Sequence, residues 1–127
     1  MDKIILYHYS NVDFKDKIKI SFFGANTYTR HSRNLSIIKR SHFYLDRDKK
    51  EYFFNGVKFL YIVEINKNKL YNLNTDDLKC NSNFNDVTDF YKFLKKQGYS
   101  GIIGYNGYNV VILFKNIKIT NKIKLLV

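Results

Sequence analysis

The chain has 127 residues, which is the length of one ordinary domain and too short for two. Hydrophobic residues make up 45% of the chain and aromatic residues 17%, enough for a packed core, which argues against intrinsic disorder. Its single cysteine, Cys80, rules out internal disulfides and a cysteine-based zinc cluster. No apolar run approaches the roughly 20 residues that a membrane helix requires. We therefore expect one domain over residues 1–127, with no membrane span and a cytoplasmic location.

The charge of the chain is strongly positive, with 22 Lys and Arg against 11 Asp and Glu and a formal net charge of +11. A charge of this sign favours binding to nucleic acid, to an acidic protein or to phosphate groups. The basic residues are spread along the chain, however, and most are lysines, whereas bidentate recognition of bases or phosphates favours arginine. Two interpretations stay open: a nucleic-acid site, or a basic surface that is only solvated.

The first half of the chain predicts two strands separated by a long connection. Residues 3–9 have the content of a strand, and no small-residue cleavage site of a signal peptide follows them. Residues 11–41 show no sustained period and predict a long loop with one short helix; such loops are often functional. A short strand over 42–45 and two helical turns over 48–54 complete this half.

The second half predicts a central strand and the main helix. Residues 57–65 alternate in the manner of a strand, and a short strand over 70–73 and a polar loop over 74–85 follow. Apolar residues at helical spacing, ended by Gly98, predict a helix over 86–97. The apolar residues are Val87, Phe90, Tyr91 and Leu94. The remaining predicted strands cover 101–103, 109–114 and an edge strand within 117–127. Many strands, one main helix and long loops define an α+β fold.

The common sequence motifs of phosphate, dinucleotide, calcium and zinc sites do not occur in this chain. It contains no phosphate-binding loop, Rossmann glycine fingerprint, EF-hand or HExxH zinc motif. His8, His31 and His42 lack the spacing of metal ligands, so we expect no metal site. Cys80 lies on a polar stretch without a neighbouring base, which is more typical of an incidental thiol than of a nucleophile.

A series of short motifs runs through the chain. They are YHYS at 7–10, SHFYL at 41–45, YIVEI at 61–65, LYNL at 70–73, GYSGII at 98–103 and YNVVILFK at 108–115. Their order resembles the ADP-ribosyltransferase superfamily, particularly the small stand-alone domains of phages, mobile elements and toxin systems. The resemblance spans roughly residues 6–119. It implies a small split β-sandwich that binds NAD and transfers ADP-ribose to a macromolecular target, protein or nucleoprotein.

The resemblance also implies roles for individual residues. His8 matches the histidine that holds ribose hydroxyls in the family, with Tyr9 and Ser10 in the places of its glycine and threonine. Tyr44, and after it Tyr52, matches the aromatic residue that stacks on nicotinamide. Asn109 stands where the family usually has an acid that orients the ribose 2′-hydroxyl. Each of His8, Tyr44 and Asn109 lies at or near a predicted strand end, so we expect them to line one cleft.

Asn109 is the main departure from the family pattern. Cleavage of the nicotinamide bond passes through an oxocarbenium-like state, which a nearby carboxylate stabilises. Asn109 can hydrogen-bond a hydroxyl but carries no charge. Two outcomes follow: an active enzyme, in which Glu64 or Asp46 can substitute for the acid, or a silent relative that binds a protein or nucleic acid through its basic surface. A nucleic-acid-binding domain unrelated to NAD is the third alternative.

A basic stretch without acidic residues is the candidate contact for the NAD diphosphate or the target. It contains Arg30, Arg33, Lys39 and Arg40. Every candidate also has a purely structural interpretation: His8 and Tyr44 as core residues, Asn109 as a turn residue, and the basic stretch as a solvated loop. By resemblance alone, the setting would be a phage or mobile-element effector against host defence, as some anti-CRISPR transferases are.

Overall fold

The computed structural model describes residues 2–20, 41–47, 57–79, 87–104 and 110–125. Within these ranges the regular structure consists of short strands, one α-helix and one 3₁₀ turn. In chain order the elements are β1 (Lys3–Ser10), β2 (Lys17–Ile18), β3 (Ser41–Tyr44), β4 (Phe59–Asn66), η2 (Lys67–Lys69), β5 (Leu70–Asn72), α3 (Val87–Lys96), β6 (Gly101–Ile103), β7 (Val110–Leu113), β8 (Ile117–Lys118) and β9 (Asn121–Lys124). The predicted α+β class is confirmed.

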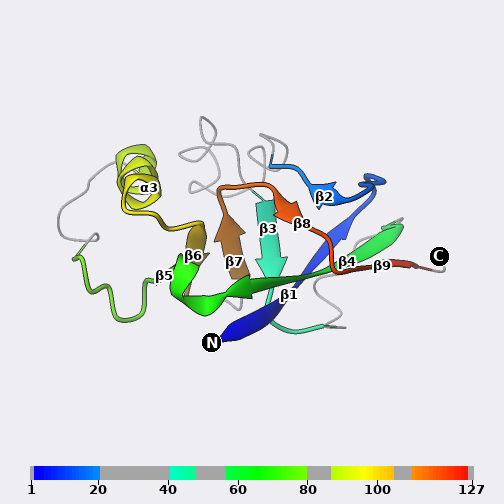
Figure 1. Ribbon diagram of the computed structural model, residues 1–127, viewed down its shortest axis with the longest axis horizontal. Helices are drawn as coiled ribbons and strands as arrows, with labels where there is room; N and C mark the ends of the chain where they lie inside the picture. Colours follow the sequence, from blue (N-terminus) through cyan, green and yellow to red (C-terminus); the bar gives the residue numbers. More distant parts are fainter. Residues whose placement is uncertain (1, 21–40, 48–56, 80–86, 105–109, 126–127) are drawn as a thin grey trace.

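Seven strands form one sheet in the order β5-β6-β7-β3-β1-β4-β9, and β2 and β8 form a separate two-stranded ribbon (Figure 1). Neighbouring strands are antiparallel except β5 and β6, which are parallel. β3 lies at the centre of the sheet. The strand predicted over 57–65 corresponds to β4, which is interior to the sheet, since it pairs with β1 on one side and with the edge strand β9 on the other. The predicted edge strand in the tail is confirmed by β9.

The sheet must curl strongly, because β4 and β5 are joined by only three residues although five strand-to-strand steps separate them. Those steps would span about 24 Å in a flat sheet. The chain from Asn66 to Leu70 can span at most about 14 Å. The curl brings the end of β4 toward the strands at the other side, and a cavity of about 270 Å³ lies between them. It is lined by Glu64, Ile65, Asn66, Ser100, Leu113, Lys115, Asn116 and Ile117.

One face of the sheet packs against the β2–β8 ribbon, and we call it the ribbon face. Its buried residues are Leu6, Ile18, Phe43, Tyr61, Val63, Leu70, Val111 and Leu113. The alternation predicted for 57–65 holds within β4, since Phe59, Tyr61, Val63 and Ile65 all pack in this core. β2 corrects the prediction for 11–41, which contained no strand, because two residues are too few to create a visible period.

The opposite face packs against α3 over β5, β6 and β7, and we call it the helix face (Figure 1). Its core consists of Tyr71, Phe90, Tyr91, Leu94, Ile102, Ile112 and Phe114. Ile112 lies between two ribbon-face residues on β7, which places the two cores on opposite sides of the sheet. A third, smaller cluster of Tyr9, Val57 and Leu60 covers the β1–β4 part of the helix face. Within the described ranges, no helix has the length and apolarity needed to cross a bilayer.

Candidate functional site

His8 lies near the end of β1 on the ribbon face, and its imidazole is held by a backbone contact. Its Nδ1 lies 2.7 Å from the carbonyl oxygen of His42 on the neighbouring strand β3. A carbonyl can only accept a hydrogen bond, so this contact requires the hydrogen of His8 to be on Nδ1. Nε2 is then the acceptor nitrogen of the ring, and no hydrogen bond from the described residues reaches it.

Aromatic rings surround this imidazole. The ring of Phe43 lies 5.0 Å from it, centroid to centroid, and those of Phe14 and Tyr61 each lie 6.3 Å away. Burial lowers the pKa of His8 below its ordinary value of 6.5, and the bond to the His42 carbonyl only partly opposes this shift. His8 is therefore neutral at physiological pH, with its hydrogen on Nδ1 and with Nε2 as a hydrogen-bond acceptor.

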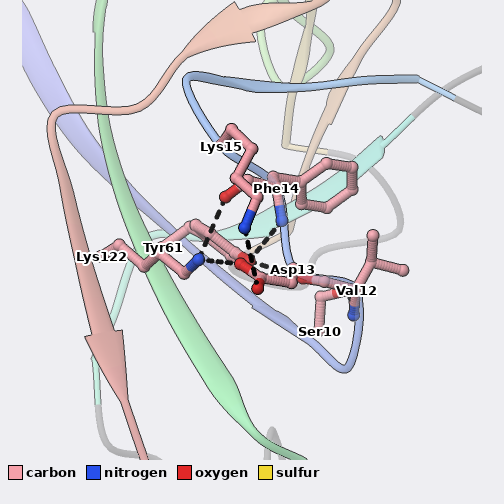
Figure 2. Close-up of polar contacts among 7 residues, drawn as sticks. All are labelled: Ser10, Val12, Asp13, Phe14, Lys15, Tyr61 and Lys122. Atoms are coloured by element: carbon pink, nitrogen blue, oxygen red, sulfur yellow. Dashed lines mark hydrogen bonds and ion pairs between the residues drawn. The ribbon is translucent and has the colours of Figure 1, made fainter.

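A buried hydroxyl positions the loop that covers His8. The ring of Tyr61 is fully buried, and its hydroxyl donates to the Val12 carbonyl at 2.5 Å and accepts from the Phe14 N–H at 2.9 Å (Figure 2). Burial raises the pKa of Tyr61, so the hydroxyl keeps its proton. These two bonds hold Phe14 against His8. We call Tyr61, Val12 and Phe14 the hydroxyl tether.

Charged groups reinforce the tether from the solvent side. The ammonium of Lys122, from β9, binds the Asp13 carboxylate and donates to the Phe14 carbonyl at 3.2 Å (Figure 2). Lys15 pairs with the same carboxylate at 3.2 Å. These hydrogen bonds lower the pKa of Asp13. Lys122 also lies 4.7 Å from the centre of the Phe59 ring. The loop is thus fastened to β4 and β9 together.

The structure does not bring His8 and Tyr44 together. Tyr44 is paired with Tyr7 in the β1–β3 register, and side chains alternate along a strand, so Tyr44 points to the helix face and His8 to the ribbon face. Its ring lies 6.3 Å from that of Tyr9. The expected cleft lined by both His8 and Tyr44 is therefore not formed. Phe43 is the β3 aromatic beside His8.

The other predicted residues divide into two groups. Tyr9 is buried on the helix face, and the Ser10 hydroxyl accepts from the Val12 N–H at 3.0 Å, closing the turn after β1. Glu64 is exposed and points away from the ribbon face, since its neighbours Val63 and Ile65 pack there. Asp46 is half-buried just after β3. The remaining candidates lie outside the described residues, namely Arg30, His31, Arg33, Lys39, Arg40, Tyr52, Cys80 and Asn109.

The strands that carry the three main motifs are nevertheless adjacent. β3 lies between β1 and β7, and Val110, the residue after Asn109, is paired with Tyr44. The sequence did not predict that Phe14, Phe43 and Tyr61 surround His8. The alternation in β4 did mark Tyr61 as a core residue, but nothing local indicated which residues of β1 and β3 pair with each other. No cluster of His, Cys, Asp or Glu suited to a metal occurs among the described residues.

Comparisons with known proteins add no relatives: no family model, no curated protein and no solved structure matches this chain.

Proposed function

We propose that this protein is an ADP-ribosyltransferase-like enzyme that binds NAD and transfers ADP-ribose to a macromolecular target. The observation that carries the proposal is the imidazole of His8 at the end of β1, which is neutral and held in one tautomer by the His42 carbonyl. A ribose hydroxyl is a donor, and the Nε2 of such a ring is a matching acceptor. The resemblance assigns this same contact to His8.

The surroundings of His8 suit a ribose joined to an aromatic base. Phe14 is only half-buried, and its N–H bond to the Tyr61 hydroxyl holds its ring beside the imidazole, 6.3 Å away and tilted by 53°. We assign Phe14 the contact with the nicotinamide or its ribose, in place of Tyr44, which points to the other face. Lys122 and Lys15 lie beside Phe14 and supply positive charge for a diphosphate.

The order of strands gives further support. Asn109 immediately precedes β7 in the chain, and only β3 lies between β7 and β1. The family's three motifs therefore occur on three adjacent strands. Asn109 would then hydrogen-bond the 2′-hydroxyl without contributing charge. On this proposal the fold is of the split β-sandwich type, and the protein acts in the cytoplasm as an effector of a phage or mobile element, a setting that rests on the resemblance alone.

Calorimetric titration with NAD tests the proposal. We expect wild-type protein to bind NAD and His8→Ala to bind it about three- to tenfold more weakly, since a neutral hydrogen bond contributes about 0.5–1.5 kcal/mol. His42→Gln is the matched control, because the bond that orients His8 uses the backbone carbonyl of His42 and survives the substitution. Wild-type protein that fails to bind NAD, or His8→Ala that binds it normally, would contradict the proposal.

A transfer assay separates the enzyme from a silent relative. Biotinylated NAD is incubated with the protein and a cell lysate, and labelled macromolecules are detected after denaturation. We expect labelling with wild type and with His42→Gln, and none with His8→Ala. NAD binding without labelling by any variant would instead indicate a binding protein that has lost the transfer reaction.

A further inference from the structure

The β2–β8 ribbon presents lysines away from the core in a fixed register. Lys17 is paired directly with Lys118, and Ile18 with Ile117. Ile18 is fully buried, and Ile117 packs in the same core. Because side chains alternate along a strand, Lys17 and Lys118 point to the opposite side, toward solvent. Both lysines are exposed. Like charges directly opposite each other destabilise a ladder, so this pair needs an explanation other than stability.

Few negative charges offset these lysines. Lys15, Lys19 and Lys115 flank the ribbon and are also exposed, and Asp16 is the one carboxylate within 14–20 and 115–119. Among the described residues, no ion pair involves Lys17 or Lys118. The ribbon is therefore a local concentration of positive charge, on a surface that faces outward from the sheet.

Hydrogen bonds hold in place the backbone that carries Lys17 and Lys118. The Asn116 side-chain oxygen accepts from the Ile20 N–H, and the Asp16 carbonyl accepts from the Ile119 N–H, both at 2.9 Å. With the buried Ile18, these bonds secure both ends of the ribbon. A ligand that binds Lys17 and Lys118 need not order the backbone beneath them, which lowers the entropic cost of binding.

We infer that the β2–β8 ribbon binds the phosphodiester backbone of nucleic acid, through Lys17 and Lys118. Lysine binds phosphate as a point charge, and two phosphates, one beside each ammonium group, relieve the repulsion of the pair. Protein interfaces, in contrast, are depleted of lysine and enriched in aromatic residues, and the outward residues of this ribbon are lysines. With no arginine among them to read bases, binding is independent of sequence. This inference is separate from the proposed NAD chemistry.

Fluorescence anisotropy with a labelled DNA duplex, measured over a series of salt concentrations, tests this inference. Each phosphate contact contributes about −0.9 to the slope of log K against log salt. Loss of both contacts in Lys17→Gln/Lys118→Gln should therefore make the slope less negative by about 1.8. The matched control is Lys92→Gln/Lys96→Gln. It removes the same charge from exposed positions of α3 and should leave the slope unchanged.

The outcomes are distinct. Equal changes in slope for the two double variants would show that binding follows net charge and would overturn the ribbon as the site, as would a wild-type protein that does not bind the duplex. Displacement of the duplex by polyglutamate, with the same dependence on Lys17 and Lys118, would assign the surface to an acidic protein. Thermal unfolding of the ribbon variant should match or exceed wild type, because the substitution removes repulsion. NAD titration of this variant keeps the two proposals separable.

Discussion

The two faces of the sheet are covered by different kinds of interaction. On the helix face, α3 packs three buried side chains against apolar residues of β5, β6 and β7. On the ribbon face, the cover consists of two-residue strands and a loop, and hydrogen bonds of Tyr61 and Asn116 hold it in place. Apolar burial thus contributes on both faces, and on the ribbon face a few directional bonds hold the cover in addition.

This difference explains why the candidate site lies on the ribbon face. The tautomer of His8 is fixed by the His42 carbonyl within the sheet, and the cover of a loop and short strands places Phe14 beside the imidazole. The same bonds that hold the cover also position Phe14 against His8. Changes on the helix face should therefore alter stability alone, and changes on the ribbon face should alter stability and ligand binding together.

The largest effect is expected in the half of the sheet that α3 covers. A Cβ added at Gly101 would lie 2.2 Å from the Ile112 carbonyl oxygen and 2.7 Å from Cδ2 of Leu113, so β6 could not keep its place beside β7. We expect Gly101→Ala to lower the free energy of unfolding by about 3 kcal/mol or more, measured by urea denaturation. The NAD affinity of the fraction that remains folded should be unchanged.

Gly98→Ala is the control for this substitution. Gly98 has a φ of +94° but nothing within 4 Å of an added Cβ. Gly98→Ala should therefore lower the free energy of unfolding only by the cost of placing an alanine in a left-handed conformation, about 1–2 kcal/mol. If the two variants unfold at the same urea concentration, Gly101 is not required by the close approach of β6 and β7.

A smaller effect is expected from the hydroxyl tether. Tyr61→Phe keeps the buried ring but removes the partner of the Phe14 N–H and the Val12 carbonyl. We expect a loss of about 1–3 kcal/mol in the free energy of unfolding, together with weaker NAD binding because Phe14 is released. Asp13→Asn is the matched control: it removes only exposed ion pairs, so its effect should be close to measurement error and disappear at high salt. Equal losses in the two variants would show that charge, and not the hydroxyl, secures the loop.

The smallest effect is expected in the pH dependence of stability. The pKa of His8 is lowered in the folded protein, so the unfolded chain takes up a proton as pH falls through 6.5 while the folded protein does not. The contribution of His8 to the free energy of unfolding is therefore complete above pH 6.5. Below this pH it decreases, by at most about 1.4 kcal/mol per pH unit. His8→Gln should flatten the curve of unfolding free energy between this pH and the lower pKa of the folded state. Parallel curves for wild type and variant would mean that His8 titrates normally when folded.

The sequence predicted most strands and the helix because their patterns are local. The predicted strand over 3–9 corresponds to Lys3–Ser10, and the predicted helix over 86–97 to Val87–Lys96. β2 was missed because Lys17-Ile18 is too short to show a period. The order of the strands was not predicted, because it depends on contacts distant in sequence, which an alternating pattern does not encode.

The candidate site was predicted only in part for the same reason. Placing His8 at a strand end required one strong pattern, and this prediction is confirmed. Assigning its aromatic neighbour required the register between β1 and β3, where a shift of one residue exchanges Phe43 for Tyr44. Both residues are aromatic, so composition does not distinguish them. The assignment to the ADP-ribosyltransferase superfamily stays a prediction, which the NAD experiments test.

The position of β1 between β3 and β4 has a consequence for how the chain folds during synthesis. His42, whose carbonyl holds His8, follows it by 34 residues, and β4 comes later still. β1 therefore leaves the ribosome before either neighbouring strand does, with both of its edges unpaired. Such long-range pairing slows folding to milliseconds or longer, and unpaired edges favour association with other chains. We expect the nascent β1 segment to be the part of this protein that most depends on chaperones.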